Sequence, residues 1–262
     1  MYEIAPQLKE RLITLVKFSD EKWTLESMQK GTLYLNTLEY FRNLEKETAV
    51  KGMGDDNEGR LILTEVDIKM YDNETGNLVL SGKAKGSAIT SQEDSEKHVL
   101  CTSYLDFGSL KIIKQGTDYF NAHIVYTEEQ KTEFKKNFGK YALIISFPQF
   151  ANNINESFKK QGIEVSAGKV KYSNFSVNYK ERLNSFTGIG NFNDKYLWKD
   201  LYFNNQKEYR LIILNRDSKE PIKIKVDDMS TYSTIVTTED LFNNQLVVES
   251  HFNPKTDLIE LE

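Results

Sequence analysis

Short apolar segments with the spacing of strands are the feature that most restricts what this chain can fold into. They are rich in aromatic and β-branched residues and are separated by turn-forming Gly, Asn and Asp. Such segments predict strands because alternate side chains of an extended chain face the same side. We predict strands at residues 13–18, 32–35, 61–71, 99–107, 122–126, 141–147, 165–175, 208–214, 222–226 and 246–249, with residues 77–82 completing a hairpin and 246–249 closing the sheet.

Fewer segments have helical spacing, and they do not alternate regularly with the strands. Ser19 and Gly31 have the residue types that start and stop a first helix, and Pro148 is a typical starter for a later one. Strands that outnumber irregularly interleaved helices predict an α+β fold with mixed or antiparallel sheets. We predict helices at residues 20–30, 37–45, 128–137, 150–161, 193–201 and 237–242, a loop at 47–60, and a polar, mobile segment at 83–97.

Length and composition favour one globular domain over residues 1–262. The 262 residues are 39% hydrophobic and 28% charged, which is ordinary for a chain that buries a core without metal or disulfide. Cys101 is the only cysteine, so we expect a cytoplasmic protein. The first ten residues lack an apolar signal region and no apolar run could cross a bilayer, so we expect no membrane partner. A net charge of −5 argues against broad nucleic-acid binding.

The sharpest local pattern is Gln206-Lys207-Glu208-Tyr209-Arg210, which leads into an apolar run. In a strand, Gln206, Glu208 and Arg210 share one face. We predict that these three polar groups form a rim at the entry of a strand. A solvated strand end with a cross-strand ion pair is the simpler structural alternative.

Gln206-x-Glu208 resembles the glutamine-x-glutamate signature of ADP-ribosyltransferases. The longer pattern Lys199…Phe203…Gln206-x-Glu208-Tyr209-Arg210 resembles the C-terminal motif of an uncharacterised bacterial and phage protein family with an ADP-ribosyltransferase-like fold. Four earlier stretches resemble segments of the same family, in the same order: residues 15–18, 31–35, 54–59 and 99–103. The order of these motifs carries the resemblance.

The resemblance implies a compact, split sheet with flanking helices and a cleft for NAD between its halves. NAD would be consumed as a substrate. Cleavage of the nicotinamide–ribose bond passes through an oxocarbenium-like state, which a carboxylate on the ribose 2-hydroxyl stabilises. The resemblance gives this role to Glu208, and Gln206 would orient the acceptor nucleophile. Ser103 would hydrogen-bond Glu208 and hold it in place.

The remaining residues of the implied NAD site are basic or aromatic. Lys17 lies where relatives use a basic or imidazole residue on the nucleotide, and a lysine there could pair with the diphosphate. Arg210 completes the motif beside the catalytic pair. Tyr34 and Tyr40, with Phe41, could stack on nicotinamide or adenine, although aromatic residues at these spacings are more often part of a core.

The loop at residues 47–60 carries the acidic cluster Asp55, Asp56 and Glu58 between glycines. Such a loop can bind a hard cation, but the spacing is not that of a calcium loop, and we assign no metal ligand. Within the resemblance this loop fixes a segment over the cleft. Arg42 or Arg60 could pair with it.

Three functions therefore stand as hypotheses. The first is an ADP-ribosyltransferase acting on a protein or nucleic-acid acceptor, as a toxin or phage-conflict effector, with an inhibitor or antitoxin protein as a conceivable partner. The second is a protein that binds a nucleotide or signalling ligand in the same cleft without chemistry. The third is a metal-dependent nuclease built on Asp55, Asp56 and Glu58.

Overall fold

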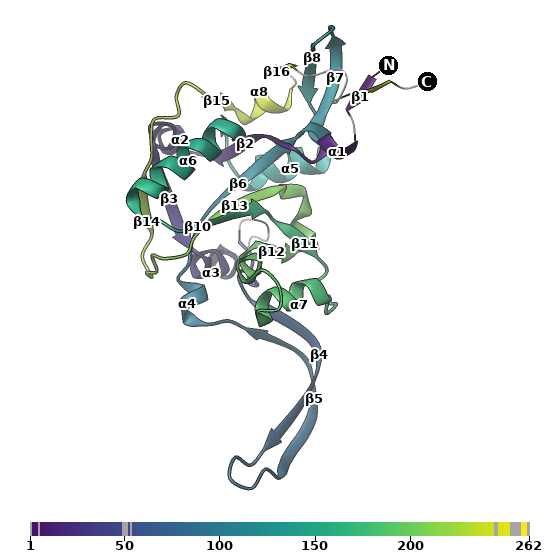
Figure 1. Cartoon of the computed structure of the whole chain (residues 1–262), viewed down its shortest axis with the longest axis vertical. Coiled ribbons are helices and arrows are strands. Elements are labelled where there is room, and N and C mark those ends of the chain that lie inside the picture. Colours follow the sequence, from purple (N-terminus) through teal and green to yellow (C-terminus); the bar gives the residue numbers. More distant parts are fainter. Residues whose placement is uncertain are drawn as a thin grey trace.

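An antiparallel sheet of eight strands forms the centre of the protein (Figure 1). The computed structural model describes residues 2–4, 6–48, 52, 54–243, 246–251 and 258–260. The main path of the sheet runs in the order β10 (Val165–Lys169), β13 (Glu208–Ile213), β6 (His98–Asp106), β2 (Leu12–Ser19), β9 (Tyr141–Ser146) and β15 (Ser233–Thr237). Off this path, β3 (Thr32–Thr37) pairs with both β6 and β14 (Ile222–Lys225).

Strand β6 changes its partner along one edge, and this change creates a fork in the sheet. Its second half pairs with β2, where Val16 lies opposite Ser103. Its first residues pair instead with β3, where Asn36 lies opposite Val99. Beyond Val16, β2 continues only along β9, so β2 and β3 diverge on either side of residues 100–102 of β6. These residues face the space between the two branches.

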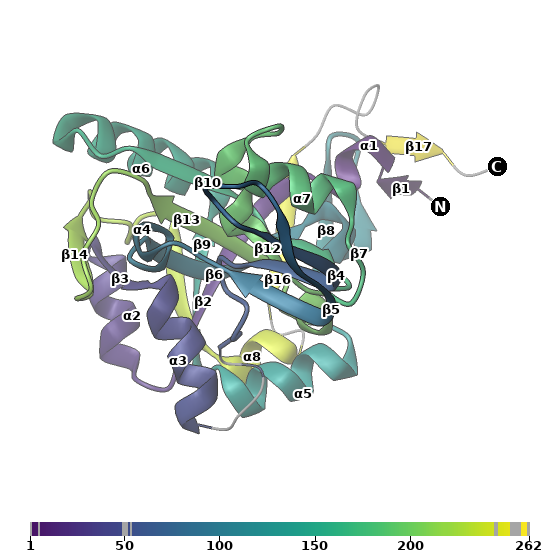
Figure 2. The same ribbon diagram turned by 90° about the horizontal axis from the view of Figure 1, so that it is seen from below.

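Helices cover both faces of the sheet (Figure 2). Helix α6 (Phe147–Gln161) packs its aromatic side chains against Leu15 and its neighbours on one face. Helices α5 (Glu128–Asn137) and α8 (Thr238–Phe242) pack against Val16 on the other. Leu15 and Val16 are adjacent in β2 and both are fully buried, because successive side chains of a strand face opposite sides.

Smaller elements surround this sheet. The remaining helices are α1 (Pro6–Lys9), α2 (Lys22–Gln29), α3 (Leu38–Thr48), α4 (Gln92–Ser95), α7 (Lys180–Thr187) and the 3₁₀ helices η1 (Phe107–Ser109), η2 (Phe192–Leu197) and η3 (Leu201–Gln206). A three-stranded sheet contains β7 (Leu110–Gln115), β8 (Tyr119–Ile124) and β16 (Val247–His251). Two-stranded pairs form between β1 (Tyr2–Ile4) and β17 (Leu258–Glu260), and between β11 (Lys171–Ser173) and β12 (Trp198–Asp200). Among the described residues, no helix has the length and apolarity needed to cross a bilayer.

The most extended element is a long hairpin of β4 (Leu61–Tyr71) and β5 (Leu78–Ile89). It projects away from the rest of the protein (Figure 1). The segment at residues 83–97, for which no strand or helix was predicted, contains the second half of β5 and helix α4. The lysines and small residues of this segment do not give the apolar alternation that predicts a strand. The segment forms a strand by pairing with β4.

The predicted α+β class is confirmed, since the chain combines several helices with mostly antiparallel sheets. Several local predictions are wrong. Residues 246–249 do not close the main sheet, because β16 pairs with β8. The strand predicted at 165–175 breaks at Val170, whose N–H donates to the carbonyl of Glu208. The helix predicted at 193–201 is a 3₁₀ helix followed by β12. Helix α7 and strand β7 were not predicted.

Candidate functional site

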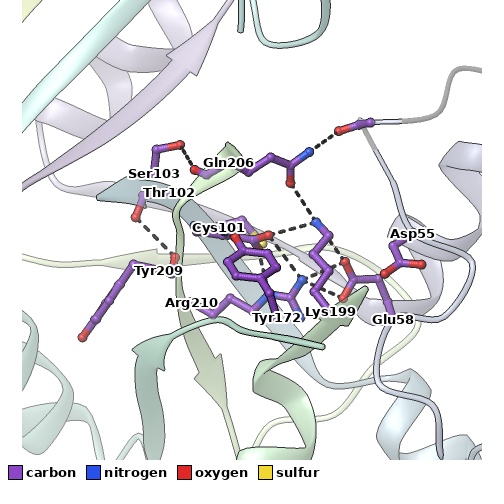
Figure 3. Close-up of polar contacts among 12 residues, drawn as sticks. Asp55, Glu58, Cys101, Thr102, Ser103, Tyr172, Lys199, Gln206, Tyr209 and Arg210 are labelled. Atoms are coloured by element: carbon purple, nitrogen blue, oxygen red, sulfur yellow. Dashed lines mark hydrogen bonds and ion pairs between the residues drawn. The ribbon is translucent and has the colours of Figure 1, made fainter. Parts of the chain in front are cut away.

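The core of the site is the buried carboxylate of Glu208, the first residue of strand β13. Figure 3 shows the side chains of Glu58, Lys199 and Arg210 close together. Strand β13 lies between β10 and β6. Its first residue, Glu208, lies opposite Ser103 of β6, and its carbonyl accepts from the N–H of Val170, which directly follows β10. Arg210 Nε donates to Glu208 Oε1 at 2.7 Å, and Lys199 Nζ donates to Glu208 Oε2 at 2.9 Å. The side chain of Glu208 is only 7% exposed. The predicted polar rim at a strand end is therefore wrong, because these groups are part of the interior.

Glu58 supplies a second carboxylate to the same two cations. Arg210 Nη2 lies 2.7 Å from Glu58, and Lys199 Nζ lies 3.4 Å from it. Arg210 also donates through Nη1 to the carbonyl of Tyr196 at 2.8 Å. Two carboxylates thus alternate with two cations in a neutral cluster, the arrangement that burial of charge requires. Glu58 and Lys199 belong to the motifs found in the sequence, but neither was predicted to be part of the NAD site.

The charge state of this cluster is fixed by its members. Burial alone would raise the pKa of Glu208, but Arg210 and Lys199 outweigh it and hold that pKa well below its usual range. Burial alone would lower the pKa of Lys199, but Glu208 and Glu58 raise it overall. These two cations therefore favour the ionised form of Glu208 at neutral pH, in which its oxygens accept hydrogen bonds.

A cavity of about 400 Å³ opens beside this carboxylate, in the fork between β2 and β3. Helices α2 and α3 and the end of α5 wall it on the outer side. The predicted site residues on its lining are Lys17, Tyr34, Tyr40, Ser103, Gln206 and Glu208. The six residues that the sequence motifs assigned to one site therefore line the same cavity. Arg210 lies behind the wall, where it is fully buried and holds Glu208.

Lys17 occupies the fork itself. Its ammonium group donates to the carbonyl of Cys101 at 2.9 Å, which satisfies a backbone acceptor that β6 exposes where it changes partner. Burial lowers the pKa of Lys17. Cys101 also lines the cavity, but burial and the nearby Glu208 raise the pKa of its thiol. The raised pKa of the thiol argues against thiol chemistry at Cys101. The amine of Lys17 is a hydrogen-bond donor inside the fork.

Gln206 lies outside β13, contrary to the prediction that it shares a strand face with Glu208. It ends the 3₁₀ helix η3, and Lys207 then turns the chain with a φ of 43°. The side chain of Gln206 nevertheless joins the cluster, because its Oε1 accepts from Lys199 Nζ at 3.0 Å. Its Nε2 donates to the carbonyl of Gly52 and to Glu133. Gln206 therefore ties the loop before Glu58 to the cavity wall.

The prediction that Ser103 hydrogen-bonds the carboxylate of Glu208 is wrong. The Oγ of Ser103 donates to the backbone carbonyl of Gln206 at 2.7 Å. Ser103 lies opposite Glu208 in the β6–β13 register, so its hydroxyl reaches the turn that precedes this residue. Tyr172, which the sequence did not indicate, accepts from the N–H of Glu208 at 2.9 Å. Ser103 and Tyr172 thus fix the backbone at Glu208, while Lys199 and Arg210 fix its carboxylate.

Tyr34 and Tyr40 lie at the accessible side of the cavity. They are 51% and 44% exposed. The alternative prediction, that these aromatic residues are part of the core, is therefore wrong for both. Phe41 does pack against the core and meets the ring of Tyr40 edge-on at 5.3 Å. The two tyrosines offer ring faces near the cavity without being needed to fill the interior.

The acidic loop does not gather its carboxylates around a common point. Glu58 faces Arg210 and Lys199, whereas Asp56 lies 2.8 Å from Lys46. The predicted pairing with arginines is confirmed: Arg42 and Arg60 contact the loop at the Glu58 carbonyl and at Asp56. No group of three candidate metal ligands occurs in the described part of the chain. Glu58 and Asp56 are already paired with side-chain cations, and Asp55 accepts from the N–H of Asn57. The three carboxylates therefore do not form the ligand set that the nuclease hypothesis needs.

Asp55 gives the loop a pH dependence. Burial and the neighbouring Glu58 raise the pKa of Asp55 to about 7, from an ordinary value of 3.8. Between these values the folded protein binds one more proton than the unfolded chain. Stability is therefore expected to fall as pH rises from 4 to 7, by up to about 1.4 kcal/mol per pH unit from this group.

The variant Asp55→Asn is expected to remove this slope, because a neutral amide can still accept from the N–H of Asn57. The measurement is the free energy of unfolding in urea at several pH values between 4 and 8. Asp56→Asn removes a charge from the same loop at a half-exposed position and is the matched control. Parallel pH profiles for wild type and Asp55→Asn would contradict the assignment.

Comparison with known proteins adds no relative: no protein-family model, curated protein or solved structure matches this chain. The assignment of function rests on the geometry of the cavity and on the motif pattern of the sequence.

Proposed function

We propose that this chain is an ADP-ribosyltransferase that cleaves NAD in the cavity at the fork and transfers ADP-ribose to a macromolecular acceptor. The observation that carries the proposal is the position of Glu208. It is an ionised, buried carboxylate on the wall of a cavity that also contains Lys17. The split between β2 and β3 is the kind of sheet opening that the motif resemblance implies.

The chemistry follows from the fixed charge of Glu208. As the nicotinamide–ribose bond breaks, positive charge develops on the ribose, and a carboxylate held against the 2-hydroxyl interacts more strongly with that state than with the substrate. Lys199 donates to Oε2 of Glu208 and Arg210 donates to Oε1, so each carboxylate oxygen already accepts one hydrogen bond. A carboxylate oxygen has further acceptor capacity, so a hydroxyl in the cavity can still donate to it.

The other lining residues suit the remaining parts of a dinucleotide. Lys17 offers a point charge for the diphosphate, and an anion there would favour its charged form. Tyr34 and Tyr40 offer ring faces at the accessible side of the cavity. A volume of about 400 Å³ is within the range of small-molecule sites. The net charge of −5 favours a protein over a nucleic acid as acceptor. A toxin or phage-conflict role rests on the motif resemblance.

One observation favours a second function, the binding of a nucleotide without chemistry. Both carboxylate oxygens of Glu208 are already in ion pairs, and the amide of Gln206 is held by Gly52 and Glu133. In that case the cluster is a structural support for the cavity wall. The same residues would then hold the ligand and leave its glycosidic bond intact.

Incubation of the purified chain with NAD separates the two functions. We expect NAD to bind, by calorimetry, and nicotinamide to be released, by chromatography, with faster release when the acceptor is present. Binding without release over hours would support the second function. Absence of both binding and release would contradict both.

A further inference from the structure

Three residues of β3 line one wall of the cavity. Thr32, Tyr34 and Asn36 alternate with two fully buried leucines. They therefore share the face of β3 that borders the cavity. The ring of Tyr34 is half exposed, and Asn36 follows it about 7 Å further along the strand. An aromatic ring and an amide thus lie next to each other on this wall.

The side chain of Asn36 contains an acceptor that the fold leaves unpaired. Its Oδ1 is shielded from solvent and has no hydrogen-bond partner in the described part of the chain. A buried polar atom without a partner costs free energy, and a ligand group that donates to it recovers that cost. The terminal torsion of an asparagine is soft, so a rotation of the amide presents both its oxygen and its NH₂ group to the cavity.

Strand β6 places this wall at one end of the cavity and Glu208 at the other. The partners of Glu208, Lys17 and Asn36 on β6 are residues 103, 101 and 99. Successive partners are therefore about 7 Å apart along the strand. With the nicotinamide-side ribose at Glu208 and the diphosphate at Lys17, the adenosine half of NAD extends towards Asn36. The order of the three side chains is the order of these parts in the dinucleotide.

Adenine has the chemistry that this wall can bind. Its flat ring stacks on aromatic side chains, and its edge carries a 6-amino donor beside a ring-nitrogen acceptor. An asparagine amide is complementary to this edge, because its oxygen accepts from the amino group while its NH₂ group donates to the ring nitrogen. We propose that Tyr34 and Asn36 form the adenine subsite of the cavity, which rests on the proposed function for the direction in which NAD lies. Tyr34 stacks on the base, and Asn36 binds its edge.

Removal of one donor from the ligand tests the pairing. The probes are NAD and its analogue with purine in place of adenine, which lacks only the 6-amino group, and binding is measured by calorimetry. We expect the wild-type chain to bind NAD at least about 10-fold more tightly than the purine analogue, because the analogue leaves the oxygen of Asn36 unpaired. In Asn36→Leu, which has a similar size and no polar group, this preference should fall below about 2-fold.

Asn137→Leu is the matched control. Asn137 lines the same cavity, but it lies beside Gly52, whose carbonyl accepts from Gln206, and so at the end near Glu208. This variant should keep the wild-type preference. Circular dichroism checks the fold of each variant, and Asn36→Ala, which also lacks the amide, should lose the preference as Asn36→Leu does.

Tyr34→Ala tests the second half of the subsite. Stacking on a ring does not depend on the 6-amino group, so this variant should weaken the binding of NAD and of the purine analogue alike, by about 10-fold. A change in the preference between the two ligands, with no general loss of affinity, would contradict a stacking role for Tyr34.

The outcomes separate this subsite from the proposed function. Equal preferences for NAD over the purine analogue in wild type and Asn36→Leu would overturn the subsite and leave NAD binding intact. Nicotinic acid adenine dinucleotide, in which a carboxylate replaces the carboxamide, tests the reverse direction of NAD. If Asn36→Leu changes the preference for NAD over this analogue and not over the purine analogue, Asn36 faces the nicotinamide, and the assignment to adenine is wrong. If no dinucleotide binds to the wild-type chain, the proposed function fails together with the subsite.

Discussion

Glu208→Gln is expected to lower the rate of nicotinamide release from NAD by about 100- to 1,000-fold, with NAD affinity changed by less than about 5-fold. This is the size of effect found when one preorganised electrostatic group is removed from a transition state. The amide keeps the shape of the side chain but loses its negative charge. That charge interacts most strongly with the ribose in the transition state, when the nicotinamide–ribose bond is breaking. The measurement is single-turnover release of nicotinamide, with calorimetry for binding.

Glu58→Gln is the matched control for this variant. Glu58 contacts the same two cations as Glu208, so both substitutions remove one charge from the same buried cluster. We expect Glu58→Gln to lower the rate by less than about 10-fold, because only Glu208 is assigned to the ribose. Equal losses in the two variants would mean that the cluster supports the wall and that neither carboxylate acts in catalysis.

Arg210→Met is expected to lower the free energy of unfolding by about 3–5 kcal/mol. Arg210 is fully buried and contacts both Glu208 and Glu58. Its loss leaves two carboxylates facing only Lys199, and a buried charge without a partner is among the most destabilising features of a protein interior. Urea unfolding followed by circular dichroism measures the change.

Lys30→Met is the control for the arginine variant. Lys30 lies 3.1 Å from Asp228, but both side chains are more than half exposed, so the loss of this pair should change the free energy of unfolding very little. If Arg210→Met does not fold, the double variant Arg210→Met with Glu208→Gln should regain stability, because it removes one of the stranded charges. A loss for Arg210→Met as small as that for Lys30→Met would contradict the role of the cluster.

The sequence predicted the elements whose hydrophobic spacing or capping residues are local. Strand β4 and helix α5 lie at the predicted residues, and Thr127 caps α5 by accepting from Gln130. The first half of β5 was predicted as part of a hairpin, but its second half was missed, because residues 83–89 are largely Lys, Gly, Ser and Ala, which carry little apolar signal. Residues 246–249 were predicted correctly as a strand, but their partner β8 is distant in sequence and depends on tertiary packing.

The site shows the same limit. Glu208, Gln206, Ser103, Lys17 and the two tyrosines were found from sequence motifs, and they do share a cavity. Most ion pairs of the cluster could not be predicted, because they join residues of β12, β13 and the acidic loop that only the fold brings together. Spacing within a strand indicated that Arg210 and Glu208 share a face. It could not indicate that both are buried.

The structure of the Glu208→Gln variant with bound NAD tests the central claim most directly, since this variant should bind the dinucleotide without consuming it. The account predicts the nicotinamide-side ribose in the fork between β2 and β3, with its 2-hydroxyl about 3 Å from the side-chain amide of residue 208. The diphosphate should lie beside Lys17. A dinucleotide bound elsewhere, or bound with this ribose away from residue 208, would contradict the account.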